Sequence, residues 1–153
     1  MVGRVAGKRI APAALHALKE ALSLVYWYKV DLRSFLTQSL GDAAVLGRIN
    51  WDDYKRNIVG QLVDYLARNE DIYQRQILKL MVDVANIQDF DHLARLDDGR
   101  SKAEQARAAV EALRDQISSL HTFLEEERNI EWRRQEAVER KARVDAVQQM
   151  LQE

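Results

Sequence analysis

The C-terminal third of the chain contains no residue that would end a helix. After Gly99, neither proline nor glycine occurs in the 153-residue sequence. The run Ser101-Lys102-Ala103-Glu104 has the form of a capping box, which pairs a serine hydroxyl and a glutamate with two free amides at a helix start. We therefore predict one helix from Ser101 to the C-terminus, roughly 75 Å long at about 1.5 Å per residue. Such a helix needs a packing surface from another chain, from this chain's globular part or from a further domain.

The first half of this helix carries a heptad pattern. Apolar residues recur at alternating steps of three and four, which is typical of a coiled-coil seam. After Leu124 the pattern breaks, and a seven-residue spacing resumes in a shifted frame that resembles a stutter, at Ile130, Ala137, Val144 and Leu151, with Val147 between them. We predict that the partner seam includes the following residues: Val110, Leu113, Ile117, Leu120, Leu124 and Trp132.

Charges along the second half of the helix are segregated. The charged residues of 125–131 sum to −3, whereas those of 133–143 sum to +3. An antiparallel pairing of two copies centred near Trp132 would lay the acidic block on the basic block. This arrangement is a hypothesis about self-association.

The first hundred residues predict a bundle of short helices. Pro12 suits a first helical turn, and Leu15, Leu18, Leu22 and Val25 follow it at helical spacing. No strand-length alternation or hairpin signal occurs. We predict an all-α protein with a flexible basic arm over 1–10, a compact bundle of five or six short helices over 11–98, and a long C-terminal helix with coiled-coil character over 100–153.

Several helix ends and one helix face can be predicted as well. Asp31 and Asn50 are candidate N-caps of the second and third main helices, and Gly41 is the expected end of the second. The third helix is predicted to place Tyr54, in series with other apolar residues, on its buried face. Gly60 lies inside that helix, where glycine costs stability but allows a neighbour to approach closely.

Composition narrows the functional classes. Residues 1–99 carry 13 Lys+Arg and 13 Asp+Glu, and residues 100–153 carry 10 and 11, so the basic excess typical of nucleic-acid binding is missing from both parts. There are no cysteines, which excludes disulfides and thiolate metal sites. No stretch has the length and apolarity of a signal peptide or a membrane span. We expect a cytoplasmic protein with no membrane partner.

The sequence offers little that resembles an active site. Asp53-Tyr54-Lys55 and Glu139-Arg140-Lys141 have the acidic-x-Lys form of metal-dependent nucleases, but both fall in helical pattern. Helix capping and ion pairs one turn apart account for them. The three histidines lie far apart, and no phosphate-binding glycine loop or nucleophile triad is present. We expect no enzymatic activity, no cofactor and no metal.

Two aromatic-rich stretches are candidate docking surfaces. Three consecutive aromatic residues cannot all face one helix stripe, so at least one ring of Tyr26-Trp27-Tyr28 is expected at a helix junction or on the surface, where such rings favour partner contacts. The alternative is that the rings only fasten a helix corner to the bundle. The predicted docking residues are Tyr26, Trp27, Tyr28, Trp51, Lys55 and Arg56.

The same stretches resemble a known bacterial module. The segments 18–36, 51–59 and 92–99, above all Trp51-Asp52-Asp53-Tyr54-Lys55-Arg56, are similar to the N-terminal helical region of restriction-endonuclease-like proteins of the Mrr type. The resemblance covers roughly residues 14–150. It implies that a nuclease domain follows the helix in the family, with its catalytic residues beyond Glu153. At the level of fold alone, the succession of helices also resembles death-like effector-associated adaptor domains.

Together these features predict a non-catalytic interaction or oligomerisation module, the N-terminal regulatory part of a restriction-endonuclease-like defence protein. The expected partner is a second copy or a nuclease effector, with DNA reached only through that effector. Two alternatives stay open. One is a nucleic-acid-binding helical protein that uses the basic segment 133–143, and the other is a stand-alone structural coiled coil.

Overall fold

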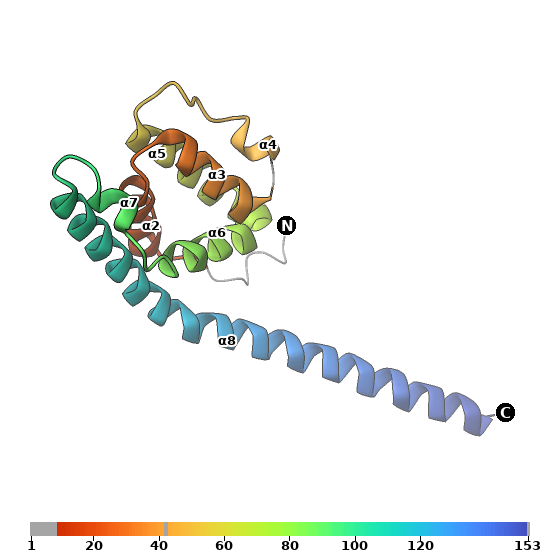
Figure 1. The fold of residues 1–153 in the computed structure, drawn as a ribbon. Coiled ribbons are helices and arrows are strands. Elements are labelled where there is room, and N and C mark those ends of the chain that lie inside the picture. Colours follow the sequence, from red (N-terminus) through yellow and green to blue (C-terminus); the bar gives the residue numbers. More distant parts are fainter. Residues whose placement is uncertain (1–8, 42, 153) are drawn as a thin grey trace. The chain divides into compact units, whose positions relative to one another are not determined.

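The computed structural model describes the backbone of residues 9–41 and 43–152, and their side chains apart from residues 43, 121–132, 134, 135 and 152. Within these residues there are seven helices and no strand, which confirms the predicted all-α helical bundle (Figure 1). The helices are α2 Pro12–Val25, α3 Lys29–Leu40, α4 Ala43–Leu46, α5 Lys55–Arg68, α6 Glu70–Ala85, α7 Asp91–Ala94 and α8 Gly99–Gln152.

The core forms where the apolar stripes of α2, α3, α5 and α6 meet. Helix α2 packs on α5 and α6, and α3 and α5 also pack on α6. Each stripe repeats every three or four residues, so its side chains lie on one face of the helix. Twelve large side chains are fully buried: Leu18, Leu22, Leu32, Leu36, Ile58, Leu62, Leu66, Ile77, Leu80, Met81, Leu93 and Leu113.

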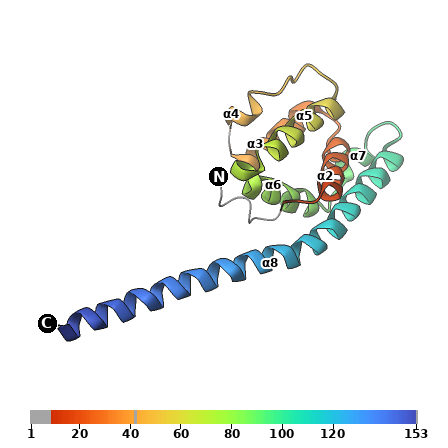
Figure 2. The ribbon, with the colours of Figure 1, turned by 180° about the vertical axis from the view of Figure 1, so that it is seen from behind.

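The first turns of α8 belong to this bundle. They lie beside α7 and α2 in both views of the ribbon (Figures 1 and 2). Ala103, Ala106, Val110 and Leu113 are all buried. The first part of the heptad pattern therefore contributes to the protein's own core.

Four predicted helix details are wrong. Helix α3 begins at Lys29, so Asp31, the predicted N-cap, lies in its first turn. Helix α8 begins at Gly99, so Ser101 lies inside it, and the hydroxyl of Ser101 accepts a hydrogen bond from Gln105. Helix α5 begins at Lys55, because the side chain of Asn50 instead accepts the amide of Asp52 in a local turn. Tyr54, which precedes α5, is therefore exposed rather than buried.

The turn between α7 and α8 is tightly constrained. Asp98 has a positive φ of 54°, a conformation that side-chain-bearing residues rarely adopt. Gly99 follows it, and a Cβ at this position would overlap the backbone carbonyls of Leu93 and Ala94. Because Gly99 has no side chain, its backbone can lie close to the carbonyls at the end of α7, and α8 begins there.

The end of α3 agrees with the sequence prediction. Gly41 has φ 65° and donates its amide hydrogen to the carbonyl of Thr37, as expected for a helix end.

By its internal contacts the chain divides into two units between Ser118 and Ser119, so the boundary falls inside α8. The second unit consists of the rest of α8. Among the described residues, no helix has the length and apolar character needed to cross a bilayer.

Candidate interaction surfaces

The aromatic loop Tyr26–Tyr28, which joins α2 to α3, is held in place by two lysines. The ammonium of Lys55 lies 4.9 Å from the centroid of the Trp27 ring, and that of Lys102 lies 4.6 Å from it. Ammonium groups at such distances are attracted to the ring. Lys55 comes from α5 and Lys102 from α8, so Trp27 ties three separate parts of the bundle together.

Lys55 is a structural cation. Its ammonium donates to the carbonyl of Tyr26 at 2.6 Å and to that of Trp27 at 3.3 Å, just beyond the C-terminus of α2. Partial burial lowers the pKa of Lys55. The carbonyls at this end of α2 lack helical partners, and the lysine supplies donors for them.

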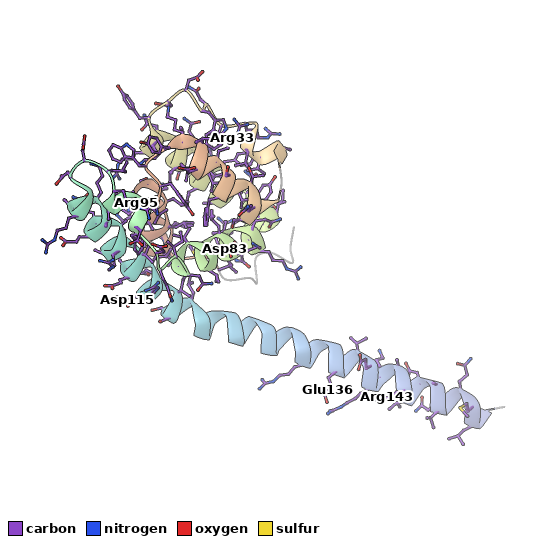
Figure 3. All side chains as sticks on the ribbon, viewed as in Figure 1. Arg33, Asp83, Arg95, Asp115, Glu136 and Arg143 are labelled. Atoms are coloured by element: carbon purple, nitrogen blue, oxygen red, sulfur yellow. The ribbon has the colours of Figure 1, made fainter. Side chains whose placement is uncertain are left out.

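Trp51 is fixed by a similar set of contacts. Its indole nitrogen donates to the carbonyl of Leu46 at 2.9 Å, and the guanidinium of Arg33 lies 4.8 Å from its ring. The ammonium of Lys29 donates to the Trp51 carbonyl at 3.2 Å. Arg33 projects from α3 in Figure 3. These contacts agree with the alternative prediction for the aromatic residues, that they hold a corner between helices against the bundle.

The loop Tyr26–Tyr28 and Trp51 together form an aromatic corner of the bundle, and part of this corner is open to solvent. Trp27 is 49% exposed and Tyr28 56% exposed, with Val30 and Tyr54 more exposed still. Arg56 is exposed too, although it pairs with Glu20 at 2.7 Å. The corner therefore combines a fixed backbone with accessible rings, and its docking role stays a prediction.

The ring of Tyr26 packs against helix α7. Its ring stacks on His92 of α7, with 5.5 Å between the centroids, and a ring nitrogen of His92 lies 2.6 Å from the carbonyl oxygen of Val25. Burial and then the charge of Asp31 raise the pKa of Tyr26. Tyr26 and His92 line a shallow hollow of about 380 Å³ together with Asp31, Ser34, Phe35 and Gln38.

The two charged side chains of the first acidic-x-Lys tripeptide, Asp53 and Lys55, do not converge. The Asp53 carboxylate accepts the amide of Tyr54 at 2.7 Å, the side-chain amide of Asn57 at 2.9 Å and that of Gln61 at 3.3 Å. The bonds from Asn57 and Tyr54 lower the pKa of Asp53. Lys55 binds elsewhere, so the two side chains serve separate local contacts. Across the described residues, no three His, Cys, Asp or Glu side chains converge as metal ligands would.

The predicted partner seam is split by the structure. Val110 and Leu113 are fully buried in the bundle, Ile117 is half-buried and Leu120 is buried. The side chains of Leu124 and Trp132 lie outside the described residues. The structure thus gives the first two seam residues a partner within the chain itself.

Two arginines that the sequence did not single out hold α8 on the bundle. The guanidinium of Arg114 donates to the carbonyls of Ala85 at 2.7 Å and Ile87 at 3.2 Å, where α6 ends. Arg107 lies over the ring of Phe90 at 5.4 Å. All three partners lie more than 15 positions away in sequence, so local spacing gave no signal for them.

The last turns of α8 present a different surface. Every described side chain from 137 to 151 is exposed, including Val144 and Val147 at 55% each and Leu151 at 81%. Arg133, Lys141 and Arg143 are exposed as well, and Arg140 pairs with Glu136 at 2.8 Å. Figure 3 shows the side chains of this part of α8, with Glu136 and Arg143 labelled.

Comparison with known proteins adds no assignment. The chain matches no protein-family model, no curated protein and no solved structure.

Proposed function

We propose that this protein is a non-catalytic helical interaction module whose association surface is the last part of α8. The observation that carries the proposal is the exposure of Val144, Val147 and Leu151 along one side of that helix. These three side chains recur at steps of three and four, the spacing that brings residues to a common face.

Physical chemistry favours a partner for this segment. An isolated helix of this kind is marginal in water, because most helical stability in proteins comes from packing an amphipathic face. Exposed apolar side chains that form a contiguous patch are characteristic of association sites. A partner that covered this row would stabilise the helix and remove apolar area from water.

We further propose that the module regulates a DNA-cleaving effector in a defence protein. Support comes from the sequence resemblance to restriction-endonuclease-like proteins, carried above all by residues 51–56. In this chain these residues shape the aromatic corner through Trp51 and Lys55. The reading frame after codon 153 tests this part: a nuclease-like strand pattern would support it, and a stop codon with no nuclease gene nearby would oppose it.

Photo-crosslinking in the cells that naturally produce the protein tests the association surface. A benzophenone amino acid in place of Gln148, an exposed residue beside the apolar row, should capture a protein partner that mass spectrometry then identifies. Val147→Glu should abolish the crosslink. Val138→Glu is the matched control, because Val138 is also exposed but lies nine residues away, on about the opposite side of the helix. Absence of any crosslinked protein would overturn the proposed function.

A further inference from the structure

The apolar row at the end of α8 matches the heptad seam at its beginning about a single point. Val144 lies twelve residues after position 132 and Leu120 twelve before it. Val147 and Ile117 lie fifteen residues after and before, and Leu151 and Leu113 nineteen. In an antiparallel pair of identical helices with its axis at 132, each of these residues would face its counterpart, which gives three apolar layers. Leu124, the next residue of the seam, would face Arg140.

Charge disfavours the parallel alternative. The acidic block 125–131, at −3, would face residues 133–139 of an antiparallel partner, which carry two positive and two negative charges and sum to zero. Opposite charges laid along such a pair favour one orientation over the other. A parallel pair would instead set acidic on acidic and basic on basic. Apolar spacing therefore sets the axis at position 132, and the like charges that a parallel pair would bring together favour the antiparallel orientation.

We propose that α8 pairs antiparallel with α8 of a second copy about position 132, and that the bundle restrains this pairing. The inference rests on the proposed association surface and names its occupant. A two-fold symmetric contact requires a surface that complements itself, and the matched residues on the two sides of position 132 meet that requirement.

The restraint follows from the burial of Leu113 and Leu120. Leu113 is fully buried within the bundle and Leu120 is buried as well, so neither the layer of Leu113 with Leu151 of the second copy nor that of Leu120 with Val144 can form in this structure. The two hydrogen bonds from Arg114 to the end of α6 hold that part of α8 in place. Bundle packing and full pairing therefore compete for the same face of α8.

Molecular mass in solution is the first test. Sedimentation equilibrium should show a monomer–dimer equilibrium for the natural sequence and a monomer for Val147→Glu, whereas Val138→Glu should dimerise like the natural sequence. A natural sequence that stays monomeric at the highest soluble concentration overturns the inference. If the photo-crosslink at position 148 then captures a different protein, self-pairing fails but the proposed function stands.

The direction of pairing is the second test. The chain has no cysteine, so Gln149→Cys takes a single spin label on the polar side of α8. In the antiparallel pair the two labels lie 34 residues apart along the axis, about 50 Å at about 1.5 Å per residue. In a parallel pair they lie at the same level, separated by roughly the 10 Å between helix axes plus the linkers. A short distance by pulsed electron paramagnetic resonance overturns the antiparallel arrangement.

The restraint has its own test. Arg114→Ala removes both hydrogen bonds to the end of α6, and it should lower the dimer dissociation constant by about tenfold, because hydrogen bonds from charged groups contribute on this scale. Arg107→Ala, which removes the contact with Phe90, should act in the same direction. The circular dichroism of both variants shows whether the bundle remains folded. Unchanged or weaker dimerisation in two folded variants would show that the bundle does not compete with pairing.

Discussion

Replacing Leu113 by alanine should cost the bundle about 3 kcal/mol of unfolding free energy. Leu113 is 0% exposed, and the change removes three carbon atoms from a closed site. At about 0.8 kcal/mol per buried methylene the lost transfer energy is about 2.4 kcal/mol, and an unfilled cavity adds to it. The total lies in the range of about 2–5 kcal/mol known for such changes.

Urea unfolding followed by tryptophan fluorescence measures this cost, since Trp27 and Trp51 report on the bundle. The protein should be dilute enough to be monomeric. Leu151→Ala is the matched control: the same truncation at a residue 81% exposed should change the free energy by less than about 0.5 kcal/mol. Equal effects of the two substitutions would refute the conclusion that the start of the heptad seam packs in the bundle.

Three further changes test other contacts. Gly99→Ala should destabilise the protein by more than about 1 kcal/mol in thermal unfolding, because the new Cβ would meet backbone atoms at the end of α7. Glu70→Ala should cost about 1–3 kcal/mol in urea unfolding, because the buried amide of Ile10 loses its carboxylate acceptor at 3.0 Å. Burial tends to raise the pKa of Asp83, but hydrogen bonds from Lys79 and from a serine of α3 outweigh it and lower that pKa. The stability from Asp83 should therefore be present above about pH 4 and fade as pH falls further, so Asp83→Asn and the natural protein should converge in acid.

The sequence predicted the fold class because its apolar stripes are strongly periodic. Leu18, Leu22 and Val25 face the core as their spacing predicted. The heptad pattern was less decisive, since steps of three and four are the same whether a helix packs on another chain or on its own bundle. Val110 and Leu113 look like coiled-coil residues in the sequence, and only the three-dimensional packing shows that the bundle covers them.

Helix ends and long-range contacts were harder to predict. Ser101 and Glu104 have the residue types of a capping box, yet the turn at Asp98 and Gly99 starts the helix two residues earlier. The exposure of Trp27 followed from three aromatic residues in a row. Its contact with Lys102 did not, because the lysine lies 75 positions away and only the packing of α8 brings it close.

Hydrogen exchange at two protein concentrations tests the central claim, that the end of α8 is an association surface for a second copy. Between a dilute and a roughly hundredfold more concentrated sample, the backbone amides of residues 136–151 should become markedly slower to exchange. Val147→Glu should remove this dependence and Val138→Glu should keep it. Equally fast exchange of these amides at both concentrations in the natural protein would contradict the claim.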